Sequence, residues 1–279
     1  MIKTEEPVSK ELQNKLNRLE EVIRELGSLA VGFSGGVDSA FLLAAASQVL
    51  GDRALAVTNA DASVPAREVE EAAAFCKQRG IRHIICRLNP LDDENYRKNG
   101  PERCYFCKRG IFTEIGRIAR ENGIEYVAEG SNLDDLGDYR PGLKAVSELG
   151  VKSPLREAGL TKSDIRQLSK AMGLPTWSKP AYACLASRFV YGEEITAEKL
   201  HMIERAEQFL IGHGFLQERV RMHGMMARIE VAPEEIEKIA AEKMRRAIME
   251  EFVKIGFSYV ALDLKGYRTG SMNEVLQKE

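Results

Sequence analysis

The segment Leu29–Leu50 constrains the fold of this chain most strongly. A short apolar run ends in Ser34–Gly36, and an apolar stretch of helical character follows from Asp38. This order predicts a buried strand, a tight glycine turn and the first turn of a helix. Such a turn directs backbone N–H groups and the positive end of the helix dipole toward one anion. The segment therefore predicts an anion site at the end of the first strand.

The glycine turn lacks the features of two common nucleotide-binding patterns. No Gly-Lys-Ser/Thr follows the glycines, as a Walker-type loop requires, and the dinucleotide fingerprint Gly-x-Gly-x-x-Gly is absent. The string Ser34–Ser39, which reads Ser-Gly-Gly-Val-Asp-Ser, instead resembles the pyrophosphate loop of enzymes that split ATP into AMP and pyrophosphate. A plain structural turn is the alternative, and the length of the match argues against it.

Further strand and helix patterns follow in alternation. We expect strands at 54–58, 83–88, 126–129 and 151–155, and helices at 9–26, 65–79, 111–122 and 161–173. Strand–helix–strand units predict an α/β fold with a doubly wound parallel sheet. Ligands of such sheets bind beyond the carboxyl ends of the strands, so Thr58 should lie near the glycine turn.

The regular pattern breaks at 175–180, where we place a domain boundary. Beyond it we expect a helix at 196–212, a hairpin of 218–223 with 227–231, a long helix at 233–256 and a strand at 259–264. These elements predict a small αββαβ domain at 179–279, after a nucleotide-binding domain at 1–178.

Composition limits the class of protein. The chain has 279 residues, of which 44% are hydrophobic and 29% charged, as is typical of a soluble globular protein. The net charge of −2 gives no general attraction to nucleic acid, and no apolar run has the length of a membrane span. Five cysteines, an odd number, favour a reducing compartment over a disulfide framework. We therefore expect a cytoplasmic protein without nucleic-acid or membrane partners.

A dense polar loop, Gly130–Gly142, follows the predicted strand at 126–129. Polar loops at the carboxyl end of a strand often carry function. We expect Gly130 and Asn132 to line the nucleotide site. Asp38 and Asp135 should help to hold the Mg²⁺ of ATP, because magnesium prefers carboxylate and phosphate oxygens. The alternative is a solvated turn, in which Asn and Asp side chains hold the backbone.

The cysteines divide into two groups. Cys76 falls in a predicted helix and Cys86 in a predicted strand, so both are expected in the core. Cys104 and Cys107 form a Cys-x-x-Cys in the polar, turn-rich stretch 92–109, which we expect to be a loop. The pair fits half a zinc site, a redox pair or two ligands of an iron–sulfur cluster. A second Cys-x-x-Cys for zinc is absent, and a redox pair is expected at a helix start in a thioredoxin-like unit.

Two features of the C-terminal half also suggest chemistry. Cys184 is predicted in a loop, where nearby Lys179 and Arg188 favour the thiolate, the form that attacks or binds metal. Arg219 and Arg221 alternate along a predicted strand, so both guanidinium groups should point to one face. They form either a solvent-exposed edge or a fork for an anionic substrate.

Five motifs together resemble the LarE-type sulfur transferases of the PP-loop ATP pyrophosphatase superfamily. They are Ser34–Ser39, Gly130–Gly142, Trp177–Arg188, Arg219–Arg221 and Gly266–Asn273. The resemblance implies that ATP adenylates a carboxylate of pyridinium-3,5-biscarboxylic acid mononucleotide, and that sulfur then enters to give a thiocarboxylate. Two rounds would give the dithio precursor of the nickel-pincer cofactor.

The resemblance also implies roles for particular residues. The expected ATP and Mg²⁺ site comprises Ser34, Gly35, Gly36, Asp38, Ser39, Thr58, Gly130, Asn132 and Asp135. Arg219 and Arg221 match arginines thought to hold the substrate phosphate, and Glu207 is a weaker match. In related enzymes these residues meet between subunits, which implies a homo-oligomer, either a trimer or a dimer of trimers.

The family delivers sulfur in two ways. In one, a lone cysteine at the position of Cys184 attacks the adenylate, gives up its own sulfur and becomes dehydroalanine. In the other, three cysteines hold a 4Fe-4S cluster. Because Cys104 and Cys107 accompany Cys184, we favour the cluster form, with these three as ligands and Cys184 and Asp38 as catalytic residues. A tRNA thiolase, an ammonia-dependent synthetase and a nucleotide-sensing module remain alternatives.

Overall fold

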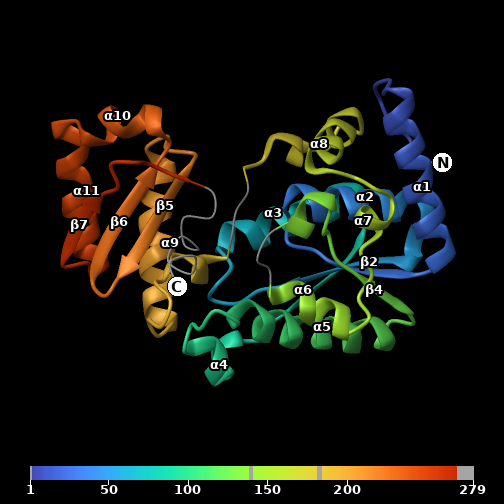
Figure 1. Ribbon diagram of the computed structural model, residues 1–279, viewed down its shortest axis with the longest axis horizontal. Coiled ribbons are helices and arrows are strands. Elements are labelled where there is room, and N and C mark those ends of the chain that lie inside the picture. The colour runs from blue at the N-terminus through green and yellow to red at the C-terminus, as the bar shows by residue number, and fades with distance from the viewer. Residues whose placement is uncertain (1, 138–140, 181–183, 269–279) are drawn as a thin grey trace. The chain divides into compact units, whose positions relative to one another are not determined.

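The computed structural model describes residues 2–137, 141–180 and 184–268 (Figure 1). The chain forms two compact units, one of residues 1–90 with 102–182 and one of residues 91–101 with 183–279. The predicted domain limits, 1–178 and 179–279, stay a prediction.

The first unit is built on a parallel sheet with the strand order β3–β2–β1–β4. The strands are β1 (Leu29–Gly32), β2 (Ala54–Asn59), β3 (Arg82–Cys86) and β4 (Tyr126–Ala128). Because the chain adds β2 and β3 on one side of β1 and β4 on the other, the loop after β1 lies at a topological switch point. Ligands of open α/β sheets bind at such points.

Helices cover both faces of this sheet (Figure 1). They are α1 (Lys10–Leu26), α2 (Val37–Leu50), α3 (Ala66–Arg79), α5 (Arg103–Glu121), α6 (Pro141–Glu148), α7 (Pro154–Glu157) and α8 (Lys162–Ala171). One core joins α1, α2, α3, α7 and α8 to Leu29 and Val31, and a second joins α5 and α6 to Ala30. Successive residues of β1 thus serve opposite faces, which confirms the doubly wound sheet.

Local sequence signals account for several helix ends. Ser9 Oγ accepts a hydrogen bond from Leu12 N at 3.2 Å and caps α1. The capping box of Thr161 and Asp164 is present at the start of α8. Both helices therefore begin where the sequence predicts.

Helix α5 begins earlier than the sequence suggests, at Arg103 and not at Ile111. Cys104 and Cys107 therefore lie in its first turns, and the prediction of a loop is wrong. Gly110 lies within the helix, where an added Cβ would stand 3.2 Å from Leu88 Cδ2. The buried positions of α5 are concentrated in its second half, so its polar first half looks like a loop in the sequence.

Two other predicted elements also differ. The segment 151–155 is not a strand, because Pro154 begins α7 and only the bridge between Lys152 and Ala128 remains. The predicted long helix at 233–256 is interrupted at Ala241, whose ψ of 143° is extended. It forms the short helix α10 (Ile236–Ala240) and α11 (Glu242–Ile255).

The second unit contains a three-stranded sheet in the order β5–β6–β7. The elements are α4 (Glu94–Arg97), α9 (Ala197–Gly212), β5 (Glu218–His223), β6 (Met226–Val231) and β7 (Tyr259–Leu262), together with α10 and α11. The predicted hairpin is present, with β5 and β6 antiparallel, whereas β6 and β7 are parallel.

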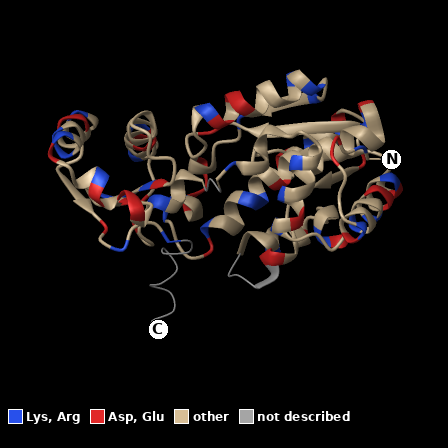
Figure 2. Cartoon of the chain, turned by 90° about the horizontal axis from the view of Figure 1, so that it is seen from above, with Lys and Arg blue, Asp and Glu red and all other residues tan. Residues whose placement is uncertain are grey.

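Charge is mixed over both units. Figure 2 shows Lys and Arg interspersed with Asp and Glu along the helices. In the part of the chain that the structure describes, no helix combines the length and the apolar character that crossing a membrane requires. The absence of a nucleic-acid partner stays a prediction.

Candidate functional site

The loop after β1 forms a cradle at the N-terminus of α2. Gly35 has a φ of +71°, which residues with a side chain rarely adopt. Ser34 Oγ lies 3.0 Å from Ser39 Oγ and accepts a hydrogen bond from Gly36 N at 3.4 Å. No side chain among the described residues caps α2, so its first backbone N–H groups point to a place that suits a phosphate.

Gly130, just beyond β4, closes this cradle. An added Cβ would stand 3.0 Å from Ser39 N and 3.2 Å from the carbonyl carbon of Asp38. We expect Gly130→Ala to displace the loop, to lower the free energy of unfolding by about 1–3 kcal/mol and to weaken ATP binding. Urea denaturation and calorimetry with ATP measure both effects. Gly212→Ala, in the open helical environment of α9, is the control, and equal behaviour of the two variants would contradict the expectation.

Asp38 is the second residue of α2, and its two carboxylate oxygens differ. Oδ2 accepts a hydrogen bond from Lys162 Nζ, whereas Oδ1 is buried without a hydrogen-bond partner among the described residues. Burial raises the pKa of Asp38 against the opposing effect of Lys162, and Asp135 raises it further. A buried, unsatisfied carboxylate oxygen suits a hard cation, so Asp38 fits the expected Mg²⁺ ligand.

The polar loop holds its own backbone. Asn132 Oδ1 accepts from Asp134 N, and Asp135 Oδ2 accepts from Asn132 N, both at 2.9 Å. Asn132 and Asp135 thus make the hydrogen bonds expected if the loop is a turn in which Asn and Asp side chains hold the backbone. The charge of Asp135 also raises the pKa of Asp38. Asp138, Tyr139 and Arg140 lie outside the described residues.

Thr58 has a structural contact at the end of β2. Its Oγ1 donates to the carbonyl oxygen of Phe33 at 2.7 Å and lies 2.9 Å from His83 Nε2. Thr58 is buried, so it ties β2 to the start of the phosphate cradle. Its expected contact with nucleotide stays a prediction.

Lys179 also supports the cradle, which the sequence pattern does not indicate. Its Nζ donates to Gly35 O at 3.2 Å, to Glu68 Oε2 at 2.6 Å and to Glu71 Oε2 at 2.7 Å. Burial works against the charged form, yet the two carboxylates raise the pKa of Lys179 overall. The ammonium of Lys179, which was expected to favour the thiolate of Cys184, is therefore paired with two glutamates of α3.

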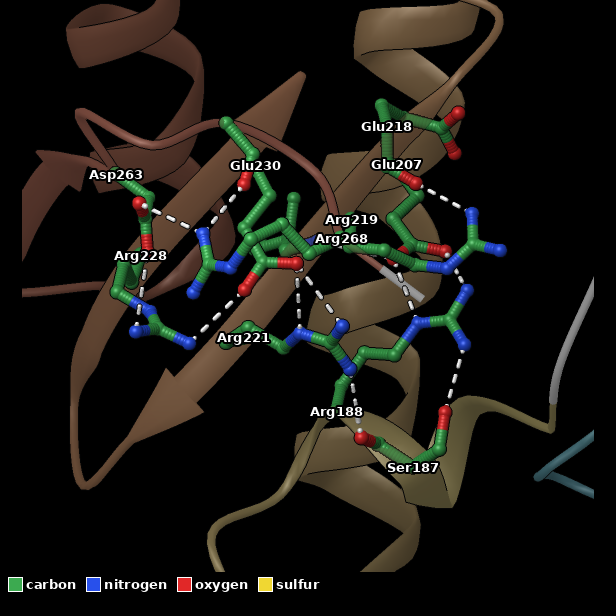
Figure 3. Close-up of polar contacts among 12 residues, drawn as sticks. Ser187, Arg188, Glu207, Glu218, Arg219, Arg221, Arg228, Glu230, Asp263 and Arg268 are labelled. Atoms are coloured by element: carbon green, nitrogen blue, oxygen red, sulfur yellow. Dashed lines mark hydrogen bonds and ion pairs between the residues drawn. The ribbon is translucent and has the colours of Figure 1, made fainter. Parts of the chain in front are cut away.

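The second unit contains a dense cluster of arginines and acidic residues (Figure 3). Arg188 forms a bidentate pair with Glu207, with Nε–Oε1 and Nη2–Oε2 distances of 2.8 and 2.9 Å. Arg221 donates to Glu230 Oε2 at 2.9 Å and to Ser187 O at 2.9 Å. Both arginines are nearly inaccessible to solvent. Buried charges of this kind require partners, and each of these arginines has a carboxylate.

Arg219 has different surroundings in the same cluster. It is buried, its guanidinium donates to the Glu218 carbonyl oxygen, and its Cζ lies 5.1 Å from the centre of the Tyr267 ring. Burial and the nearby Arg188 lower the pKa of Arg219. Arg219 and Arg221 therefore do not form a solvent-exposed edge, although β5 is an edge strand.

Glu218 is a functional candidate that the sequence analysis missed. Its side chain is inaccessible to solvent, and neither carboxylate oxygen has a hydrogen-bond partner among the described residues. Burial and the charge of Glu207 raise the pKa of Glu218 to about 8, against the effect of Arg219. A Glu before Val and Arg on a strand looks like an ordinary surface residue, so no local signal marks it.

The cysteines lie in both units. Cys104 is exposed and Cys107 partly buried on α5 of the first unit, and Arg103 Nη2 lies 3.7 Å from Cys104 Sγ. Cys184 is exposed in the second unit, where Arg188 donates to its carbonyl oxygen at 3.3 Å. Cys76 and Cys86 are buried, as expected.

The donor chemistry of the three accessible thiols suits an iron–sulfur cluster. Within the described ranges, no group of three or more His, Cys, Asp or Glu side chains is arranged to hold a metal ion. The cluster therefore stays a prediction from the sequence.

Known proteins match this chain over different lengths. The NAD synthase family model matches residues 11–107, which include the cradle. An uncharacterized protein of Synechocystis sp. is 43% identical over 96% of this chain and 100% of that protein. Pyridinium-3,5-bisthiocarboxylic acid mononucleotide synthase of Lactiplantibacillus plantarum is 35% identical over 96% of each. A subunit of the glutamine-hydrolyzing GMP synthase of Archaeoglobus fulgidus is 26% identical over 73% of this chain and 70% of that protein.

The share of the chain that each match covers distinguishes a sulfurtransferase from an ammonia-dependent synthetase. The NAD synthase model stops before most of the second unit, and the GMP synthase subunit covers less of the chain than the synthase from L. plantarum does. The match to that synthase spans the cradle, the cysteines and the arginine cluster. The chain therefore belongs to the LarE-type sulfurtransferase family of PP-loop ATP pyrophosphatases, the family of pyridinium-3,5-bisthiocarboxylic acid mononucleotide synthase.

Proposed function

We propose that this protein is an ATP-dependent sulfurtransferase that converts carboxylates of pyridinium-3,5-biscarboxylic acid mononucleotide to thiocarboxylates. The proposal rests on one observation, that two features occur in the same chain. The first unit has a phosphate cradle, and the second has an exposed cysteine beside a cluster of arginines. The full-length match to the synthase from L. plantarum supports this substrate.

The first step is activation of a carboxylate. A substrate carboxylate oxygen attacks the α-phosphorus of ATP, the bond to the β-phosphate breaks, and pyrophosphate leaves. Backbone N–H groups at the start of α2 stabilise the charge that develops on the leaving group. Asp38 would hold Mg²⁺ through Oδ1, and the ion would neutralise part of the pyrophosphate charge when bound.

The second step replaces AMP with sulfur. We propose that Cys104, Cys107 and Cys184 ligate a 4Fe-4S cluster, which would supply an exchangeable sulfide when bound. Cys104 and Cys184 are exposed and Cys107 is partly buried, whereas Cys76 and Cys86 are buried, and this difference supports the assignment.

Direct use of Cys184 is the alternative route. Its thiolate would displace AMP to form a thioester. Loss of its Cα proton to a base, with cleavage of its Cβ–S bond, would then leave dehydroalanine and release the thiocarboxylate. A single accessible cysteine suffices for this route, so it gives no role to Cys104 and Cys107.

Arg219 and Arg221 are proposed to bind the phosphate of the substrate. Because the pKa of Glu218 is raised to about 8, its carboxyl group is mostly protonated and neutral at pH 7, which makes the charge of their cluster more positive. Guanidinium groups suit phosphate because they donate paired hydrogen bonds. The trimer or hexamer implied by the family resemblance is a separate proposal.

Anaerobic incubation with ATP, Mg²⁺, the dicarboxylate mononucleotide and sulfide tests the proposed function. We expect stoichiometric pyrophosphate release and a product whose mass reflects exchange of one oxygen for sulfur. Pyrophosphate release only with tRNA would favour a thiolase, and release only with ammonia an amide-forming synthetase. ATP binding without pyrophosphate release under any condition would indicate a sensor.

A further inference from the structure

Glu218, the first residue of β5, has a buried carboxyl group that no donor satisfies. The side chain is inaccessible to solvent, and neither of its oxygens has a hydrogen-bond partner among the described residues. An ionised carboxylate in such a place loses its hydration without gaining hydrogen bonds in return. The neutral acid loses much less, so these surroundings favour a Glu218 that keeps its proton.

The charged groups around Glu218 come from three parts of the second unit (Figure 3). Glu207 of α9 opposes ionisation of Glu218, whereas Arg219 on the same strand and Arg188, before α9, favour it. On β6 the residue paired with Glu218 is Val231, which carries no charge. Burial and Glu207 prevail and raise the pKa of Glu218 to about 8. The carboxyl group is therefore neutral in most molecules at pH 7 and ionised in most at pH 9.

Arg219 links Glu218 to the proposed substrate site. Its guanidinium donates to the Glu218 carbonyl oxygen, and its Cζ lies 5.1 Å from the centre of the Tyr267 ring. The charge of Arg219 favours ionisation of Glu218, and a negative Glu218 in turn favours the charged form of Arg219. Arg221, in contrast, donates to the carboxylate of Glu230. A change in the charge near Arg219 therefore reaches Glu218 directly.

A phosphate group on Arg219 would change the balance at Glu218. The phosphate dianion would offset the positive charge of Arg219, which favours the ionised carboxylate more than that of Arg188 does. Its negative charge would also oppose ionisation by itself, because charges in a buried cluster are only weakly screened. A Glu218 that is ionised before binding should therefore be protonated once the phosphate is bound.

We infer that Glu218 is a positioning residue for the substrate phosphate, and that its carboxyl group takes up one proton from solvent when the phosphate binds to Arg219. The inference rests on the proposed function and adds a residue and a proton to it. With the proton in place, Arg219 has a neutral neighbour and donates to the phosphate. Without the proton, the carboxylate of Glu218 competes with the phosphate for the charge of Arg219.

Calorimetry of the wild-type protein with pyridinium-3,5-biscarboxylic acid mononucleotide, without ATP, tests this coupling. Titrations at pH 8 in buffers of different ionisation enthalpy give the number of protons bound with each nucleotide. The phosphate of the free nucleotide is already a dianion at this pH. From the pKa of about 8, we expect uptake of about half a proton per site at pH 8 and a Kd about 8-fold higher at pH 9 than at pH 7.5.

Two neutral replacements, Glu218→Gln and Glu218→Met, have side chains of similar size. Both should bind the mononucleotide without this proton uptake, and with a Kd that is nearly constant from pH 7.5 to 9. Glu250→Gln, at an exposed position of α11, is the control and should keep the wild-type behaviour. A merely structural role of Glu218 would instead raise the Kd of both variants equally at every pH. Should neither variant fold, the proton uptake of the wild type still decides.

The outcomes separate this inference from the proposed function. Wild-type binding of the mononucleotide without proton uptake overturns the inference, and so does unchanged proton uptake in Glu218→Gln. Neither result affects the proposed function, because the nucleotide still binds. A wild-type protein that does not bind the mononucleotide at any pH contradicts the proposed function itself.

Discussion

Cys184→Ala is expected to lower the rate of sulfur transfer by about 1,000-fold or more. The variant should still release one equivalent of pyrophosphate per active site. The cradle that activates the carboxylate lies in the first unit, and Cys184 contributes only an exposed side chain to the second. Loss of its sulfur should therefore stop the reaction after the adenylate without destabilising the protein. A rapid-quench pyrophosphate assay and mass spectrometry of the nucleotide product give the two readouts.

The variants Cys104→Ala and Cys107→Ala distinguish the two routes for sulfur. If the three cysteines hold a cluster, each variant should lose iron, sulfide and sulfur transfer together. If Cys184 gives up its own sulfur, both variants should complete one turnover, and the spent protein should be lighter by the mass of hydrogen sulfide. Cys76→Ala, a buried position, controls for general effects on the fold.

Two results would contradict these assignments. Sulfur transfer that persists in Cys184→Ala would remove Cys184 from the mechanism. Loss of pyrophosphate release in the same variant would show that the cysteine acts before or during activation, and not after it.

The cradle could be predicted from the sequence because its determinants are local. A strand, a left-handed glycine and the start of a helix follow one another within Leu29–Ser39, and backbone geometry alone directs the N–H groups to an anion. The start of α8 was equally predictable, since Thr161 and Asp164 hydrogen-bond each other's backbone N–H groups.

Other features depend on contacts between distant segments and could not be predicted. Lys162 meets Asp38 only because the sheet brings α2 and α8 together. The position of Cys104 and Cys107 was misjudged because the first half of α5 is polar and only partly buried, so it has the composition of a loop. Burial of Glu218 is likewise a tertiary property, because the edge strand β5 is inaccessible to solvent over most of its length.

Glu218 leads to the second large expected effect, a dependence of stability on pH. Its pKa is about 8 in the folded protein and close to the ordinary glutamate value of 4.5 in the unfolded chain. Between these values the folded state binds more protons than the unfolded state. The stability therefore falls as the pH rises from about 4.5 to 8, by up to about 5 kcal/mol from this group.

Glu218→Gln should remove this contribution, because an amide stays neutral over the whole range. We expect the free energy of unfolding, measured in urea between pH 5 and 9, to depend less steeply on pH in the variant than in the wild type. The slope is the informative quantity, since a buried glutamine without partners has its own constant cost. Glu250→Gln, at an exposed position of α11, should keep the wild-type slope. Identical slopes for Glu218→Gln and the wild type would show that Glu218 is ionised, with partners of its own, in the folded protein.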